Sequence, residues 1–230
     1  MSKIRALLFD LDNTLVDFMK MKQAAVDAAV TDMIDAGLDL HRSEATRRIW
    51  EIYDREGIEF QEVFDKFLIE HYGKIDHKIL ASGIIAYRRA REAALVLYPH
   101  VEVTLIELVR RGYRLAVLSD APAKQAWLRL CSLGLQHIFE TVITPEDTGE
   151  RKPSPLPFRK ALETLGVTAD EAVMIGDWPE RDMAGAKAVG IHTVYARYGD
   201  AYHSSTSGAE REIDDISEIL DILDDDKFNR

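Results

Sequence analysis

Two carboxylates stand one residue apart where an apolar run near the start of the chain ends. The run "ALLF" covers residues 6–9, and Asp10 and Asp12 follow it in the stretch "DLDNT". A short apolar run that ends in polar residues is typical of a buried β-strand. Taken alone, the two acids fit a helix cap or a solvated turn as well as a reaction centre that needs carboxylates.

Three further motifs place reactive side chains after predicted strands. Ser119 and Asp120 end the stretch "YRLAVLSD", Lys152 lies in "RKPSP", and Asp177 ends "EAVMIGD", with Asp182 five residues later. In a parallel α/β sheet the binding crevice lies at the carboxyl ends of the strands. We therefore expect all four motifs to meet at one edge of the sheet, which favours a reaction centre over a solvated turn.

The combined set fits metal-dependent chemistry on a phosphoryl group. Clustered carboxylates bind Mg²⁺, a hard cation that prefers oxygen ligands, and the metal offsets their mutual repulsion. A lysine and a hydroxyl beside them suit phosphate oxygens. An aspartate can itself be the nucleophile and form an aspartyl-phosphate. A second carboxylate can then protonate the leaving oxygen and activate the water that hydrolyses the intermediate.

The order of predicted elements indicates an α/β fold. After about residue 98, helices alternate with strands, which predicts right-handed crossovers and a doubly wound parallel sheet. The first strand, at residues 4–9, belongs to the same sheet. Residues 199–212 are expected to form a polar loop before a final short helix. The later strands are expected at residues 113–120, within 138–147, at 171–177 and at 191–199.

The segment between the first strand and the alternating region has a different character. Residues 17–97 contain four stretches with helical apolar spacing and no convincing strand. One of these helices is expected to open on Ser43 as its N-cap. We therefore predict a core domain of residues 1–16 and 98–230, with an all-helical domain of residues 17–97 inserted after the first strand.

The bulk composition bounds the partners and the setting of the chain. Its 230 residues include 29 basic and 40 acidic ones, for a formal net charge of −11, which argues against a nucleic-acid or anionic-membrane surface. No stretch is apolar enough to span a membrane, and the N-terminus meets charge too early for a signal peptide. The lone Cys131 excludes an intrachain disulfide and fits a reducing, cytoplasmic setting. Because it lies on the apolar stripe of a predicted helix, we expect it in the core.

The order "DLDNT", "LSD", "RKPSP" and "GDWPERD" resembles the four motifs of the haloacid dehalogenase superfamily of hydrolases, over residues 4 to about 197. The resemblance implies a Rossmann-like core and a helical cap inserted after the first strand. The short stretch between Lys152 and Asp177 leaves no room for the family's second type of cap. The stretch "DAPAKQAWLRLCSLGL" is also similar to a subgroup of small phosphatases, some archaeal members of which act on glyceraldehyde 3-phosphate.

The resemblance implies a catalytic or binding role for most of the motif residues. Asp10 would be the nucleophile and a magnesium ligand, and Asp12 the general acid and base, with its backbone carbonyl on the metal. Thr14 would orient that acid. Ser119 would bind the phosphate, and Lys152 would neutralise the charge of nucleophile and phosphate.

The resemblance also implies two further metal-binding residues, and the sequence differs from the family pattern at two positions. Asp177 would bind Mg²⁺, and Asp182 would support the metal directly or through water. Asp120 stands where many relatives have a neutral residue, and its carboxylate would repel a phosphate; we expect it to turn away and leave its backbone N–H for the ligand. Trp178 is large for this position, and it is expected either to pack against the rim or to contact the substrate.

Four functions are compatible with these motifs. The first is a Mg²⁺-dependent phosphatase of a small phosphorylated metabolite, such as glyceraldehyde 3-phosphate or a similar sugar phosphate. The alternatives are a 2-haloacid dehalogenase, a phosphomutase and a non-catalytic binding protein. Dehalogenases of this family do not need the second acid, so the presence of Asp12 favours a phosphatase. Complete motifs argue against a non-catalytic role, and the oligomeric state is left open.

Substrate specificity is expected to lie in the helical domain, whose closure would expel water. Candidate contacts are Asp17 and Phe18 at the hinge and the basic residues Arg88, Arg89 and Arg91, although the run "YRRARE" also fits a solvated helix face. The histidines of this domain show no metal-ligand spacing, so no zinc site is predicted there.

Overall fold

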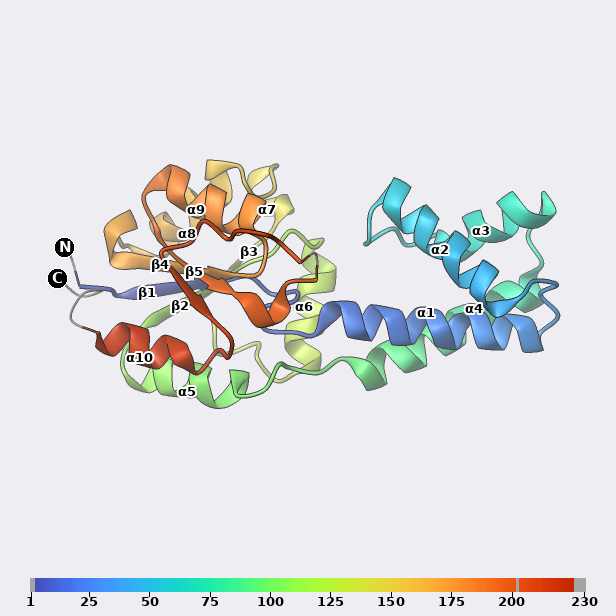
Figure 1. Cartoon of the computed structure of the whole chain (residues 1–230), viewed down its shortest axis with the longest axis horizontal. Coiled ribbons are helices and arrows are strands. Elements are labelled where there is room, and N and C mark those ends of the chain that lie inside the picture. The colour runs from blue at the N-terminus through green and yellow to red at the C-terminus, as the bar shows by residue number, and fades with distance from the viewer. Residues whose placement is uncertain (1–2, 202, 226–230) are drawn as a thin grey trace. The chain divides into compact units, whose positions relative to one another are not determined.

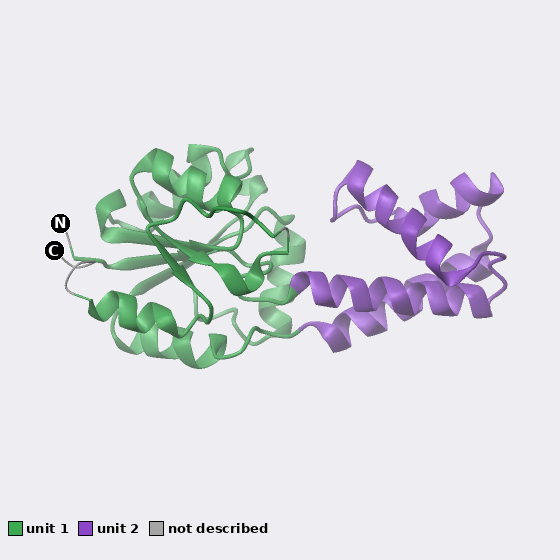
Figure 2. Cartoon of the chain, viewed as in Figure 1, with its two compact units in different colours: residues 1–17, 96–230 green, residues 18–95 purple. Residues whose placement is uncertain are grey.

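The computed structural model describes residues 3–201 and 203–225 and divides the chain into two compact units. Residues 1–17 and 96–230 form the first, called here the sheet unit, and residues 18–95 form the second, the helical unit (Figure 2). None of the described helices is long and apolar enough to cross a membrane.

The sheet unit is built on a six-stranded, fully parallel sheet, which confirms the predicted α/β fold. The strand order is β3-β2-β1-β4-β5-β6, so β1 lies in the middle (Figure 1). Every residue of β1 and of β4 is buried, as expected for strands covered on both faces. The strands are β1 Ala6–Phe9, β2 Arg114–Leu118, β3 Thr141–Ile143, β4 Ala172–Gly176, β5 His192–Ala196 and β6 Arg211–Ile213.

The register brings the ends of the central strands together. Phe9, the last residue of β1, is level with Val117 on β2 and with Ile175 on β4. The residues that follow these three strands therefore share one edge of the sheet. Asp10 stands between the other two strand ends because β1 is the central strand of the three.

Strand β6 corrects the prediction that residues 199–212 form only a loop. It pairs in parallel with β5, with Ile213 opposite Ala196. Arg211 and Glu212 are exposed and only Ile213 is buried. A three-residue strand with one buried side chain leaves no apolar run in the sequence, so its pattern resembles that of a loop.

Helices cover both faces of the sheet. Helices α7, α8 and α9 lie over one face, and α5 and α10 lie over the other (Figure 1). On the first face Phe158, Ala161 and Leu165 of α8 pack with Leu8, Met174 and other buried strand residues in one apolar cluster. The helices of this unit are α5 Val101–Arg110, α6 Ala123–Ser132, α7 Pro145–Thr148, α8 Pro155–Leu165, α9 Ala184–Val189 and α10 Glu218–Asp224.

The prediction for Cys131 was wrong, since its side chain is exposed. The buried side of α6 consists of Ala126, Arg129 and Leu130. These positions follow the three-to-four-residue spacing of one helix face, and Cys131 lies off that face. An arginine therefore occupies a buried position on α6 that the sequence analysis did not single out.

The helical unit contains four helices and no strand within residues 18–95, all of which the structure describes. Asp76 caps α4 by accepting hydrogen bonds from the backbone N–H groups of Lys78 and Ile79. Ser43 does not cap α2 as predicted, because the helix begins at Arg42 and His41 holds the N-cap position. The helices are α1 Phe18–Asp35, α2 Arg42–Glu56, α3 Val63–Tyr72 and α4 His77–Ala94.

Candidate active site

A buried lysine joins the end of β1 to the ends of two other strands. Lys152 Nζ donates a hydrogen bond of 2.6 Å to Asp10 Oδ1 and one of 2.9 Å to the carbonyl of Leu118, the last residue of β2. It also lies 2.7 Å from Asp182 Oδ1 as an ion pair. The lysine side chain is only 3% exposed, so its charge is compensated by protein carboxylates rather than by water.

Three buried carboxylates cluster at this site, and two of them, Asp10 and Asp182, contact the lysine. Oxygens of Asp10, Asp177 and Asp182 all lie within 4.8 Å of one another. Burial raises the pKa of each of the three, and for Asp177 the neighbouring charges of Asp10 and Asp182 raise the pKa further. The pKa of Asp182 reaches about 7. Three acids held this close in a dry site need more positive charge than one lysine supplies.

The pKa of Lys152 is raised as well, although burial acts on a lysine in the opposite direction. Burial alone would lower the pKa of Lys152, because burial disfavours the charged form. The pKa is nevertheless raised, since the charges of Asp10, Asp182 and Asp120 outweigh the effect of burial. Lys152 is therefore a permanent cation at neutral pH and acts on its surroundings through charge, not by giving up a proton.

The donor set around Asp177 fits a hard metal ion. Thr14 Oγ1 donates a hydrogen bond of 3.0 Å to Asp177 Oδ1. The other oxygen, Oδ2, is buried and has no hydrogen-bond partner among the described residues. A buried carboxylate oxygen without a donor, beside two further carboxylates, matches the all-oxygen sites that divalent cations such as Mg²⁺ occupy. The resemblance had implied that Thr14 orients Asp12, whereas this hydroxyl faces Asp177.

The second acid of the first motif has a cation of its own. Arg129 Nη1, from α6, donates a hydrogen bond of 2.6 Å to Asp12 Oδ2. The guanidinium is buried, with a side-chain exposure of 8%, and the Asp12 side chain is 20% exposed. Asp10 and Asp12 are thus held by different cations from different elements, although one residue separates them.

The serine and the aspartate after β2 lie in different environments. Ser119 is buried at the end of β2, and its Oγ accepts a hydrogen bond of 3.1 Å from the N–H of Ala121. Asp120 Oδ1 accepts a hydrogen bond of 2.9 Å from the backbone N–H of Lys152, and its Oδ2 accepts one of 3.1 Å from Arg181. The Asp120 carboxylate therefore holds the lysine loop in place.

The turn after β4 carries Trp178 and Arg181 side by side. The guanidinium carbon of Arg181 lies 3.9 Å from the centroid of the Trp178 ring, a cation–π distance. Asp182 Oδ2 accepts a hydrogen bond of 3.0 Å from the Trp178 N–H, which fixes this acid next to Lys152. Residues Pro179–Met183 form a π-helical turn, a distortion that often occurs at functional sites.

Tyr198 and Gly199, expected only as the end of the strand at residues 191–199, pack against the backbone of the first motif. Tyr198 donates a hydrogen bond of 2.8 Å to the carbonyl of Thr14. A Cβ placed on Gly199 would lie 1.6 Å from the carbonyl oxygen of Asn13, so only glycine permits this approach. Asn13 itself has a φ of 61°, a left-handed conformation that asparagine tolerates better than most residues. In the sequence, a glycine at the end of a predicted strand was the one signal that another backbone segment approaches closely here.

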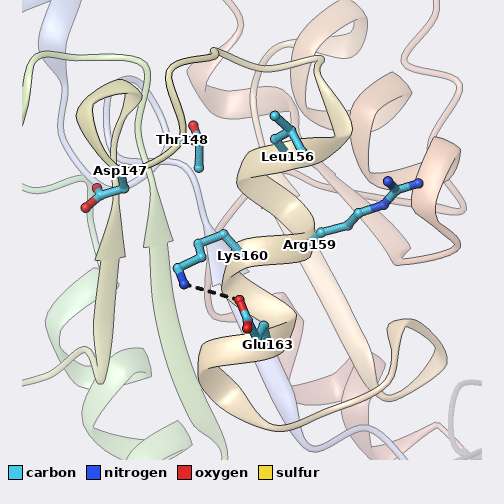
Figure 3. A pocket seen from close by; sticks show the side chains of 6 residues that line it. All are labelled: Asp147, Thr148, Leu156, Arg159, Lys160 and Glu163. Carbon is cyan, nitrogen blue, oxygen red and sulfur yellow. Dashed lines mark hydrogen bonds and ion pairs between the residues drawn. The ribbon is translucent and has the colours of Figure 1, made fainter.

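A pocket of the sheet unit lies apart from these residues. Figure 3 shows it beside α8, with the Lys160 ammonium 3.2 Å from Glu163. Its lining carries both signs of charge and includes none of the motif residues, so it is not the candidate active site. The lining residues are Asp147, Thr148, Leu156, Arg159, Lys160 and Glu163.

The fold and the site together define a class of protein. The chain is a doubly wound α/β protein with a buried carboxylate–lysine centre at the carboxyl edge of its parallel sheet. That edge is where open α/β sheets bind their ligands.

Comparison with known proteins gives the family. Residues 7–196 match the haloacid dehalogenase-like hydrolase family, and the chain belongs to it. The glyceraldehyde 3-phosphate phosphatase of Methanocaldococcus jannaschii is 35% identical, over 96% of this chain and 97% of the relative. The phosphoglycolate phosphatase of Colwellia psychrerythraea is 31% identical, over 93% and 94%. A crystal structure of a HAD phosphatase from Thermococcus onnurineus superposes with a TM-score of 0.70 at 28% identity, over 96% of this chain and 98% of that one.

Proposed function

We propose that this hydrolase is a Mg²⁺-dependent phosphatase that hydrolyses a small phosphorylated metabolite through an aspartyl-phosphate on Asp10. The observation that carries the proposal is the buried lysine that contacts both Asp10 and Asp182 within a trio of acids. A phosphoryl group and a divalent cation together balance the charges of such a site. The relatives named as phosphatases support the same reaction.

The metal would be held by the acid trio. We assign Asp10 and Asp177 as ligands through their carboxylates, Asp12 through its backbone carbonyl, and Asp182 as a direct or water-mediated ligand. When bound, Mg²⁺ neutralises the acids and stabilises the charge on the phosphoryl oxygens.

The first step of the proposed reaction is transfer of the phosphoryl group to the protein. An oxygen of Asp10 forms a bond to phosphorus, and the ester P–O bond breaks. Asp12, protonated, gives its proton to the leaving alcohol oxygen. Ser119 and Lys152 bind the phosphate oxygens, and the lysine charge stabilises the transition state.

The second step is hydrolysis of the aspartyl-phosphate. Asp12, now ionised, takes a proton from a water molecule that attacks phosphorus. The bond to Asp10 breaks, inorganic phosphate leaves, and Asp12 is again protonated for the next turnover. Asp120 contributes its backbone N–H to the phosphate, since its carboxylate is held by Lys152 and Arg181.

The substrate is a small sugar phosphate, glyceraldehyde 3-phosphate or a compound like it. The similarity to relatives named for glyceraldehyde 3-phosphate and for phosphoglycolate, over nearly the whole chain, supports this choice. We assign substrate selection to the helical unit as a cap domain, inserted between residues 17 and 96 of the sheet unit. Arg88 and Arg89 are exposed on its helix α4 and are the candidates there.

The test is a phosphate-release assay with Mg²⁺ and with EDTA. The panel contains glyceraldehyde 3-phosphate, phosphoglycolate, hexose phosphates, nucleoside monophosphates and p-nitrophenyl phosphate. We expect release that requires Mg²⁺ and favours a small sugar phosphate. Absence of release from every ester would contradict the proposal, and halide release from 2-haloacids would identify a dehalogenase instead. Isomerised hexose phosphate without free phosphate would identify a mutase.

A further inference from the structure

The buried Arg129 lies outside the four motifs that point to the reaction, yet it contacts the proposed general acid and base. Its guanidinium donates to Asp12 Oδ2 at 2.6 Å and comes from α6, 117 residues along the chain. Burying a guanidinium at 8% exposure has a large desolvation cost. A residue kept there at that cost needs a reason beyond packing, and α6 could bury an apolar side chain on the same face at lower cost.

The division of cations between the two acids gives that reason. Lys152 contacts Asp10 and Asp182, while Arg129 contacts Asp12. The rigid, planar guanidinium fixes the direction of a carboxylate, whereas an ammonium acts as a point charge. A lysine suits the nucleophile Asp10, because its ammonium can shift from the carboxylate to the oxygens of the arriving phosphoryl group. An arginine suits an acid whose carboxylate must point one way in both steps.

We propose that Arg129 is a positioning residue that holds the Asp12 carboxylate in line for proton transfer to the leaving oxygen and, in the second step, from the attacking water. The inference rests on the proposed function. Arg129 contacts neither phosphate nor metal in this scheme, and it acts on the reaction through Asp12. Its loss would therefore weaken proton transfer while the nucleophile, the lysine and the acid trio stay in place.

The leaving group provides the test. An alkyl phosphate such as glyceraldehyde 3-phosphate releases a strongly basic alkoxide and needs a proton from Asp12. p-Nitrophenyl phosphate releases a weakly basic phenolate and needs none. The quantity to compare is kcat/KM, because it reports the first irreversible step, transfer to Asp10, and not the later hydrolysis.

Arg129→Met should lower kcat/KM by about 10-fold or more on the alkyl ester, a part of the 100- to 10,000-fold that a general acid typically contributes. On p-nitrophenyl phosphate the loss should stay within about 3-fold. Arg129→Lys should recover part of the alkyl-ester activity, and it carries the same comparison if Arg129→Met does not fold. The matched control is Arg114→Met, which removes an arginine paired with Glu140 at the opposite end of β2. It should leave the ratio of the kcat/KM values for the two esters unchanged.

A double variant separates positioning from general damage. In an Asp12→Asn background, Arg129→Met should cause no further loss on the alkyl ester, because the group through which it acts is gone. Equal losses on both esters, or additive losses in the double variant, would overturn the proposal. Wild-type protein that hydrolyses neither ester would contradict the proposed function itself, so the two failures are distinguishable.

Discussion

Lys152 Nζ lies 2.6 Å from Asp10 Oδ1, and both groups are buried although 142 residues separate them in the chain. The contact fixes the carboxylate of the residue that we assign as nucleophile and brings a permanent positive charge to the place where a phosphoryl group would arrive. Most of the expected behaviour of the site follows from this pair and from the two acids beside it.

Replacing the lysine should remove both catalysis and part of the stability. Lys152→Met is expected to lower kcat by at least about 100-fold, the usual cost of losing one charge stabiliser of a transition state. It should also lower the free energy of unfolding by about 3 kcal/mol, because it leaves buried carboxylates without their cation. Steady-state kinetics and urea unfolding measure the two effects. Lys160→Met, at an exposed lysine of the same unit, is the control; activity of Lys152→Met within 3-fold of wild type would contradict the assignment.

Replacing a metal ligand should stabilise the metal-free protein. The pKa of Asp177 in the folded state lies well above the ordinary value of 3.8 for an aspartate, because the carboxyl is buried beside Asp10 and Asp182. Its ionisation therefore disfavours folding, with a penalty that is absent below about pH 4 and grows as the pH rises through the folded pKa. In EDTA we expect Asp177→Asn to have a higher Tm than wild type at pH 7 to 8, with the difference vanishing near pH 4.

Mg²⁺ should act against this difference in Tm between Asp177→Asn and wild type. A ligand that binds only the folded state raises its stability, so Mg²⁺ should raise the Tm of wild type more than that of Asp177→Asn. Thermal unfolding in matched EDTA and Mg²⁺ buffers gives both comparisons. Equal responses of the two proteins to Mg²⁺ would remove Asp177 from the ligand set.

The hydroxyl behind Asp177 should tune the metal affinity. Thr14→Val removes the donor to Asp177 Oδ1 and is expected to weaken Mg²⁺ binding by about 10-fold or more, as the loss of a partner to a ligand typically does. Thr14→Ser keeps the hydroxyl and should stay close to wild type. The Mg²⁺ concentration for half-maximal phosphate release is the measurement, and identical values for Val and Ser variants would show that the hydrogen bond does not serve the metal.

The glycine against the first motif should matter for activity. In Gly199→Ala the new Cβ would overlap the Asn13 carbonyl, so the backbone beside Asp12 has to move. We expect a loss of about 1–3 kcal/mol in stability, the cost of overpacking, together with a fall in kcat. Gly83→Ala is the control, since its Cβ meets the flexible Met33 side chain in the helical unit. Unchanged kcat in Gly199→Ala would show that this loop tolerates displacement.

The parallel fold was predictable because each central strand is a short apolar run that can be recognised from the local sequence. Apolar runs such as residues 6–9 and 172–176 are buried on both faces, and each ends in an acid. Alternation with helices then fixed their direction. Strand β6 escaped prediction because two of its three side chains are exposed.

The site was predictable only in part, for a related physical reason. Residues that follow strands in a parallel sheet converge by topology, so Asp10, Lys152 and Asp177 could be expected near one another. Arg129 and Tyr198 reach the first motif across 117 and 184 residues. Their roles depend on side-chain directions that no local pattern records, and the apolar stripe of α6 pointed to Cys131 instead.

Following the phosphoryl group itself tests whether Asp10 is the nucleophile. Wild type and Asp10→Asn would be mixed with ³²P-labelled substrate, chosen as the best ester of the panel, and quenched with acid within a single turnover. We expect radiolabel on the wild-type peptide that contains Asp10, lost as free phosphate appears, and neither label nor turnover in Asp10→Asn. Label on another residue, or Asp10→Asn turning over at the wild-type rate, would contradict this assignment.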